Sequence, residues 1–221
     1  EGHVATGAAL TDWLKADTDE LDDFIESRED LEDASAYEAD ALRTDVESDR
    51  DLLRAFAFEA EKVTRDIDPK LEALRNELVR IAEQAHEDAV TAQDERDKRK
   101  VIVFSYYADT ADWITGFLEQ VTATDPALSA YRGRVTSVSG DDDKTEALFG
   151  FAPISAEAPE GTEDRYDILV STDVLAEGVN LQQARHIINV DLPWNPMRMV
   201  QRHGRIDRIG SPHGKVYIRC F

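Results

Sequence analysis

The sequence predicts a doubly wound α/β domain over residues 97–221, preceded by an α-helical appendage over residues 1–96. Five short runs rich in β-branched residues follow residue 100, separated by helical patterns or loops, as expected for parallel strands buried on both faces. Before these runs, no glycine occurs between Gly7 and Gly116, and Pro69 is the one proline between Leu10 and Ala92. That composition is typical of helices.

The appendage carries apolar residues at helical spacing. In residues 68–85, Asp68 is placed as an N-cap, Pro69 as the first helical residue, and the apolar positions are Leu71, Leu74, Leu78, Ile81 and Ala85. A helix before this one is indicated by Leu52, Leu53, Phe56 and Val63. Residues 11–51 hold seventeen acids and four basic residues, yet their apolar residues also repeat at helical spacing. We expect a solvated helical hairpin there rather than a disordered tail.

The second region should form a parallel sheet. Strands are expected at residues 101–105, 134–139, 167–171, 186–190 and 215–221, and residues 149–165, rich in Pro, Gly and Glu, should form a surface loop. In an open parallel sheet, ligands bind at the carboxyl ends of the strands. The segments that follow the strands are therefore the candidate functional regions.

Charge and composition limit the function classes. The net charge is −22, but residues 181–221 hold seven Lys and Arg against Asp191 and Asp207, so one basic region should meet an anionic partner. A single cysteine, Cys220, excludes an intramolecular disulfide, and no apolar run is long enough to cross a membrane. We expect a cytoplasmic protein with no membrane partner. Seven Lys against eighteen Arg, with abundant Asp, are typical of a halophile.

Small residues follow the predicted strands. Backbone and hydroxyl donors at these positions could line up along a phosphodiester chain, because helix N-termini bind anions. The residues concerned are Ser105, Gly140, Ser171 and Thr172. Plain N-capping explains each of them equally well, so both interpretations stay open.

A cluster of arginines follows the fourth strand. Asn195 is a good N-cap and Pro196 suits the first helical position, so we expect a helix over residues 196–208. On this helix a polar stripe about 60° wide should be formed by the side chains of Gln201, Arg205 and Arg208. Met199 and Ile206 lie on the face opposite this stripe, and Arg202 lies off it.

Two guanidinium groups three residues apart repel each other, so helix stability does not explain Arg205 and Arg208. A shared, multiply charged anion such as a nucleotide polyphosphate does explain them. The alternative is that the arginines pair inside the domain with Asp173, Glu177 or Asp191.

The stretches VIVFSYY, DILVSTDVLAEGVNLQQA, HIINVDLPWNP and QRHGRIDRIG, in this order, resemble motifs IV, V and VI of superfamily-two helicases and translocases. Within that superfamily, the chain resembles the SWI/SNF-type ATPases, in particular their RapA-like branch. The acidic STDVLAEG is closer to the DEAD/DEAH-type RNA helicases. The resemblance implies the C-terminal RecA-like lobe of such a protein, and the composition favours a haloarchaeal member.

The resemblance also implies roles for single residues. Arg205 and Arg208 match the motif VI arginine fingers. The matching nucleotide-binding positions are Gln201, Gly204, Glu177, Gly178 and Asn180, and the positions that hold the nucleic-acid backbone are Ser105, Gly140, Ser171 and Thr172.

Two motifs that phosphoryl transfer requires are missing: the sequence contains no G-x-x-x-x-G-K-[ST] phosphate loop, and no acidic DExx motif follows any of the predicted strands. We therefore expect a fragment of a larger protein that binds ATP between two lobes, with Mg²⁺ held mainly by the first lobe and no metal ligands here. Alone, the chain should not hydrolyse ATP. The expected partners are nucleic acid, duplex DNA rather than RNA, the first lobe of the same protein, and a complex such as RNA polymerase.

Two alternatives to an ATP-dependent translocase stay open. One is a non-catalytic nucleic-acid-binding or protein-binding module derived from this lobe. The other is an RNA helicase of the DEAD/DEAH type. An autonomous hydrolase is disfavoured, because His203 and His213 lack a nucleophile at a useful spacing.

Overall fold

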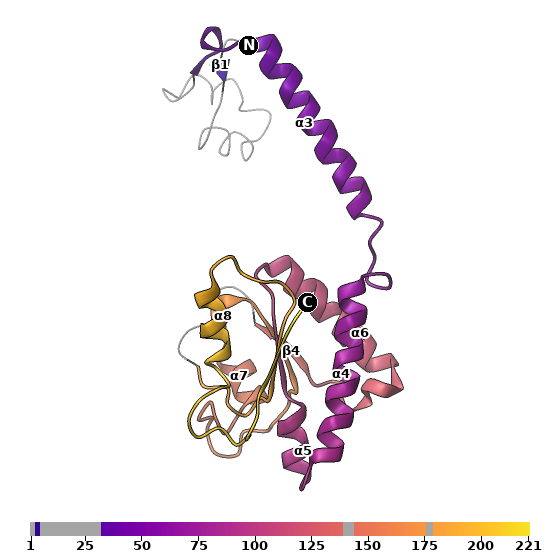
Figure 1. The fold of residues 1–221 in the computed structure, drawn as a ribbon, viewed down its shortest axis with the longest axis vertical. Helices are drawn as coiled ribbons and strands as arrows, with labels where there is room; N and C mark the ends of the chain where they lie inside the picture. Colours follow the sequence, from indigo (N-terminus) through magenta and orange to yellow (C-terminus); the bar gives the residue numbers. More distant parts are fainter. Residues whose placement is uncertain (1–2, 5–31, 139–143, 176–178) are drawn as a thin grey trace. The chain divides into compact units, whose positions relative to one another are not determined.

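The computed structural model describes residues 3–4, 32–138, 144–175 and 179–221 (Figure 1). The chain divides into two compact units, residues 1–63 and 64–221. The first unit contains two short antiparallel strands, β1 (His3–Val4) and β2 (Glu32–Asp33), a 3₁₀ turn η2 (Ala34–Ala36) and the helix α3 (Ala39–Ala60).

The helix expected before residue 63 is confirmed as α3, which ends at Ala60. Its apolar side chains Leu52, Leu53 and Phe56 are exposed. The helical hairpin expected over residues 11–51 is tested only in part, because residues 11–31 lie outside the described residues. Residues 32–36 form β2 and η2 instead of α-helix.

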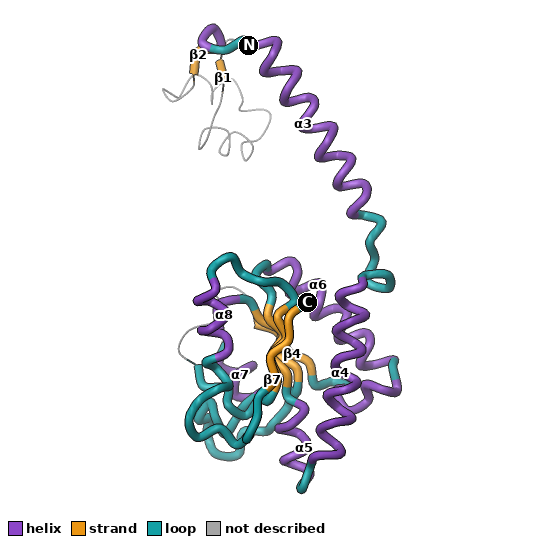
Figure 2. Tube along the Cα trace, viewed as in Figure 1, coloured by secondary structure: helices purple, strands orange, loops and turns teal. Residues whose placement is uncertain are grey.

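The second unit is built on a five-stranded parallel sheet in the order β4-β5-β3-β6-β7 (Figure 2). All five strands lie inside the predicted runs, and the predicted α/β fold is confirmed. The strands are β3 (Val101–Phe104), β4 (Val135–Val138), β5 (Ile168–Ser171), β6 (His186–Asn189) and β7 (Tyr217–Cys220). The helical elements are α4 (Pro69–Asp88), α5 (Ala92–Arg99), α6 (Ala108–Thr124), η3 (Pro126–Tyr131), α7 (Thr145–Phe151), η4 (Asp173–Leu175) and α8 (Pro196–His203).

Helices cover both faces of the sheet. Alternate residues of the central strands point to opposite faces, so Val101 and Val103 pack with α4 and α6 while Ile102 and Phe104 pack on the side of α7. Figure 1 shows α4 and α6 on one side of the sheet and α7 and α8 on the other. The loop predicted from residue 149 begins later, because α7 runs on to the fully buried Phe151.

The compact unit begins at Thr64, well before the boundary at residues 96 and 97 that the sequence predicts. The reason is α4, whose apolar stripe from Leu71 to Ile81 is buried in the core of the lobe. The Asp68 N-cap accepts hydrogen bonds from the backbone of Lys70 and Leu71 and from Trp113 Nε1. The apolar period and cap of α4 were correctly predicted, but its packing makes it part of the lobe.

The strand order creates a switch point between two neighbouring strands. The chain leaves β3 through α6 to reach β4 on one side, and leaves β6 through α8 to reach β7 on the other side. The loops after β3 and β6 therefore diverge, and open α/β sheets bind ligands in the crevice at such a point.

Candidate functional site

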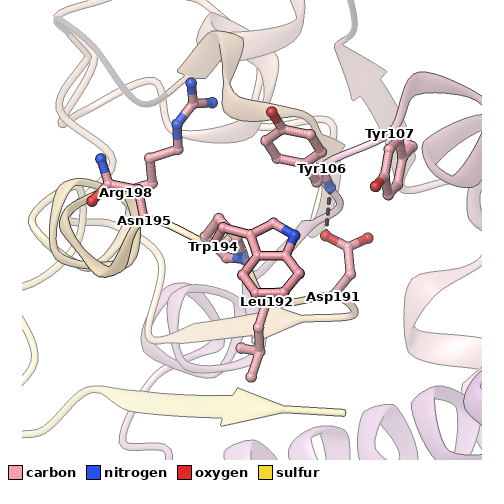
Figure 3. Close-up of a pocket in the computed structure, with 8 residues that line it drawn as sticks. Tyr106, Tyr107, Asp191, Leu192, Trp194, Asn195 and Arg198 are labelled. Atoms are coloured by element: carbon pink, nitrogen blue, oxygen red, sulfur yellow. Dashed lines mark hydrogen bonds between the residues drawn. The ribbon is translucent and has the colours of Figure 1, made fainter.

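A pocket of about 230 Å³ lies at the switch point, between the loop that follows β3 and the loop that follows β6. Figure 3 shows Arg198 on one side of the pocket and Asp191 on the other, with the rings of Tyr106 and Trp194 between them. Trp194 is fully exposed. The residues that line the pocket are Tyr106, Tyr107, Asp191, Leu192, Pro193, Trp194, Asn195 and Arg198.

Asp191 holds the two loops together. One carboxylate oxygen accepts from the backbone N–H of Tyr106 at 2.6 Å, and the other accepts from Ser105 Oγ at 2.7 Å. The Tyr107 N–H in turn donates to Ser105 Oγ. These bonds fix the turn after β3, so the edge-to-face pair of Tyr106 and Tyr107 is presented at a defined position.

The structure places the residues expected to hold a nucleic-acid backbone as follows. Ser105 and Ser171 are fully buried at the ends of neighbouring strands, and the Ser105 N–H donates to the Ser171 carbonyl. The Ser171 hydroxyl is close to the carbonyls of Val138 and Thr172. Both serines therefore tie strand ends together. Thr172 is buried just beyond β5, and Gly140 lies outside the described residues.

The arginine that sequence reasoning placed off the functional stripe, Arg202, is fully buried. Its Nε donates to Asp173 Oδ1 at 2.7 Å and its Nη1 donates to Asn189 Oδ1 at 3.0 Å. The guanidinium also lies 5.0 Å from the centre of the Phe104 ring. Arg202 thus joins α8 to the ends of three adjacent strands.

Asp173 binds a second arginine of α8. Arg198 Nη1 donates to Asp173 Oδ2 at 2.7 Å, and this bond raises the pKa of the Arg198 guanidinium. Asp173, one of the acids considered as a partner of Arg205 and Arg208, thus bonds Arg198 and Arg202. The two arginines are four residues apart, so they share a face of α8, and that spacing beside an aspartate is the signal that could have identified the pair.

The helix expected over residues 196–208 is shorter, because α8 ends at His203. Its predicted start is confirmed, with the Asn195 side chain accepting from the Met197 N–H. Beyond it, residues 204–210, here called the arginine turn, are irregular. Ile206 is fully buried and the Arg205 carbonyl accepts from Leu181, and these tertiary contacts replace further helical turns.

Gln201, Arg205 and Arg208 consequently do not share a helical stripe. Gln201 is exposed on α8, and its carbonyl accepts from Arg205 Nε. Arg208 is exposed, and its Nε donates to the Gly204 carbonyl at 2.6 Å. The turn closes at Gly210, whose φ of 92° lies in the left-handed region that favours glycine.

The arginine turn is bonded to the segment around Asn180. Arg205 Nη1 donates to the Val179 carbonyl at 3.2 Å, and Gln182 Nε2 donates to the Ile209 carbonyl at 3.3 Å. The Asn180 side chain bonds both the backbone and the side chain of Gln182. The structure therefore brings Asn180 and Arg205 to one region. Glu177 and Gly178, expected to act with Asn180, lie outside the described residues.

Burial lowers the pKa of His203 and of His213. The His213 ring bonds the Gln183 carbonyl, which indicates a structural role. Within the described part of the chain, no group of three or more His, Cys, Asp or Glu residues is arranged to hold a metal ion. The helices of these described ranges are each too short or too polar to span a bilayer.

Residues 70–210 match the model of the helicase conserved C-terminal domain. The ATP-dependent helicase YqhH of Bacillus subtilis is 36% identical over 112 residues, which cover 51% of this chain and 17% of that protein. The RNA polymerase-associated protein RapA of Serratia proteamaculans is 45% identical over 51 residues, 23% of this chain and 5% of RapA.

The ATP-dependent RNA helicase RhlB of Aliivibrio fischeri is 39% identical over 95 residues, 42% of this chain and 20% of RhlB. A solved structure of the C-terminal part of the Fun30 ATPase domain aligns with a TM-score of 0.49 and 22% identity, over 70% of this chain and 40% of that one. The chain spans a fifth or less of the length of these three curated relatives. Since the family model covers more than half of it, the chain belongs to the helicase conserved C-terminal domain family.

Proposed function

We propose that this chain is the second motor lobe of an ATP-dependent, SWI/SNF-like nucleic-acid translocase or helicase. In the full-length protein, ATP binds between this lobe and an N-terminal RecA-like lobe, and Arg205 and Arg208 act as arginine fingers. Closure and opening of the cleft between the lobes move the protein along the nucleic acid.

The arginine turn is the observation that carries this proposal. Its backbone is held by the buried Ile206 and by the hydrogen bond from Leu181 to Arg205, so the turn is fixed on the lobe. The exposed Arg208 donates from Nε to the Gly204 carbonyl, an acceptor that carries no full negative charge. A polyphosphate supplied from another lobe would provide that charge at fixed positions, which is what transition-state stabilisation by arginine fingers requires.

The nucleotide-binding residues divide between the two lobes in this proposal. Gln201, Gly204 and Asn180 support the arginine turn and its neighbouring segment, and Glu177 and Gly178 are assigned to the same site from the sequence motif alone. The phosphate loop and the main Mg²⁺ ligands belong to the first lobe, because the sequence here contains no phosphate-loop motif.

The nucleic acid lies along the carboxyl edge of the sheet, with duplex DNA as the favoured substrate. Ser105 and Ser171 fix the strand ends there, Thr172 follows β5, and Gly140 follows β4 in the sequence. Because one relative is named for its association with RNA polymerase, a polymerase complex is the partner that we propose. An RNA substrate is the second candidate, since another relative is named as an RNA helicase.

The proposal is tested by replacing the two arginines in the full-length protein. Arg205→Ala and Arg208→Ala should each lower ATP turnover by about 10³-fold, the scale associated with arginine fingers, while circular dichroism shows an intact fold. Arg132→Ala serves as the matched control, because Arg132 is exposed just beyond η3 and is not part of the arginine turn. If both variants kept turnover near that of the control, the arginine-finger assignment would be wrong.

A further inference from the structure

Asp173 holds two arginines of α8 that differ in burial. The Arg202 side chain is 0% exposed, whereas the Arg198 side chain is 44% exposed. Each guanidinium takes a different carboxylate oxygen of Asp173 at 2.7 Å. One carboxylate therefore serves two full positive charges, and the pair with Arg198 is the one that faces solvent.

The two arginines are not equally able to change partner. Arg202 is held in addition by Asn189 and lies against Phe104, so separating it from Asp173 would leave a buried charge uncompensated. The solvent-facing ion pair of Arg198 with Asp173 contributes little to the stability of the fold, because water screens the two charges. Arg198 is thus the cation that an incoming anion can take from Asp173 without disturbing the core.

Arg198 also lines the switch-point pocket. Its guanidinium lies 5.5 Å from the centre of the Tyr106 ring, and the exposed Trp194 forms another wall (Figure 3). An arginine among exposed aromatic rings is the composition of surfaces that bind nucleic-acid strands, where the cation contacts phosphate and the rings contact bases or sugars. The pocket is open to solvent at the same edge of the sheet as Ser105 and Ser171.

The charges around the pocket favour a singly charged ligand group. Asp191 faces the pocket across from Arg198, and its two carboxylate oxygens accept from Ser105 Oγ and from the Tyr106 N–H. A pocket with one arginine beside one aspartate suits a phosphodiester, which carries one negative charge per nucleotide. It suits a free nucleoside triphosphate less well, because that ligand carries several negative charges. A nucleic-acid strand therefore fits this pocket better than ATP does.

We propose that Arg198 binds a backbone phosphate of a nucleic-acid strand that enters the switch-point pocket, exchanging the Asp173 carboxylate for that phosphate. The inference deepens the proposed function and rests on it, since it names a phosphate-binding residue outside the helicase motif positions. After the exchange, Asp173 keeps Arg202 alone, and α8 retains its buried anchor.

The test is a titration of this chain with fluorescein-labelled DNA, duplex and single-stranded, followed by anisotropy at several salt concentrations. Arg198→Ala should weaken binding by about tenfold, the scale of one charge-assisted hydrogen bond. It should also reduce the slope of log affinity against log salt by about 0.9 for the duplex and about 0.7 for the single strand. Arg198→Lys should keep most of the slope, because it keeps the charge. Arg132→Ala, the matched control, should behave as wild type.

The outcomes separate this inference from the proposed function. Wild-type affinity and salt slope in a folded Arg198→Ala variant would overturn the inference and leave the arginine-finger proposal standing. A loss of ATP binding in Arg198→Ala with unchanged DNA binding would overturn the inference as well. If the wild-type chain bound neither duplex nor single-stranded DNA, the inference and the proposed nucleic-acid contact of this lobe would both be wrong. Should Arg198→Ala not fold, a loss of salt slope in Arg198→Gln but not in Arg198→Lys decides the question.

Discussion

The lobe uses its arginines in two different ways at two places. At the amino edge of the sheet, the buried Asp167 carboxylate accepts from Arg99 and Arg134, each at 2.7 Å, and Lys100 bonds Asp164 beside it. In the arginine turn, by contrast, Arg208 is exposed and bonds a backbone carbonyl. Cations at the first place are neutralised by buried carboxylates, while the second place keeps positive charge at the surface.

This difference shows why counting arginines does not locate a ligand site. The amino edge is rich in charge, and Lys100 there is so buried that its pKa is lowered, but its charges bind each other. A buried network of this kind specifies how strands and loops pack. Arginines whose guanidinium groups reach the surface are the ones that can meet an anionic ligand.

The largest expected effect on stability comes from breaking the amino-edge network. Asp167→Asn removes the buried negative charge that Arg99 and Arg134 share, and breaking a buried ion pair by removing one partner costs about 3–5 kcal/mol. Urea unfolding followed by circular dichroism measures this, with Asp112→Asn, an exposed aspartate, as the control. A cost for Asp167→Asn as small as that of the control would mean that the amino edge is not a structural network.

A pH dependence should come from His186, at the amino end of β6. Burial, and then the nearby Arg219, lower its pKa from 6.5 to about 3. Between these values the unfolded chain binds a proton that the folded chain does not, so stability falls as the pH drops from 6.5 towards 3. The loss attributable to His186 is about 2 kcal/mol at pH 5.

The comparison for this prediction is between two histidine variants unfolded in urea at pH 7 and pH 5. His186→Gln should lose less stability over this interval than wild type, whereas His86→Gln, which replaces an exposed histidine, should match wild type. An unchanged pH dependence in His186→Gln would show that the amino edge does not keep this ring neutral.

The smallest effect is expected from removing the first unit. Deleting residues 1–63 should change the free energy of unfolding of the lobe by less than about 0.5 kcal/mol, because the remaining residues form a compact unit with their own core. Thermal unfolding of the full chain and of the shortened chain, followed by the circular dichroism signals of sheet and helix, checks this. A melted lobe after the deletion would mean that residues 1–63 contribute to its core.

The elements with a strong local signal were predictable from the sequence. The helix α4 has an N-cap, a proline at its first position and an unbroken apolar period, and the central strands are runs of β-branched residues. The end of α8 was not predictable, because Ile206 becomes buried and Arg205 bonds Leu181 only once the lobe is folded. Local pattern predicts an element, and tertiary contacts decide where it stops.

The candidate site was predictable only in part. The motif resemblance singled out Asn180 and Arg205, which the structure brings into one region. It did not reveal Arg198, whose significance depends on Tyr106 and Asp173, residues that are distant in the sequence and meet it only through the strand order. The buried role of Arg202 was missed for the same reason.

The most direct test of the central claim, that this lobe supplies arginines to an ATP site completed by another lobe, is the ATP turnover of the purified chain, measured with and without DNA. The account predicts no hydrolysis above background under either condition, because the sequence contains no phosphate-loop motif to hold the phosphates of ATP. Sustained turnover by a rigorously purified chain, abolished by Arg208→Ala, would contradict it, since the site would then be complete within these 221 residues.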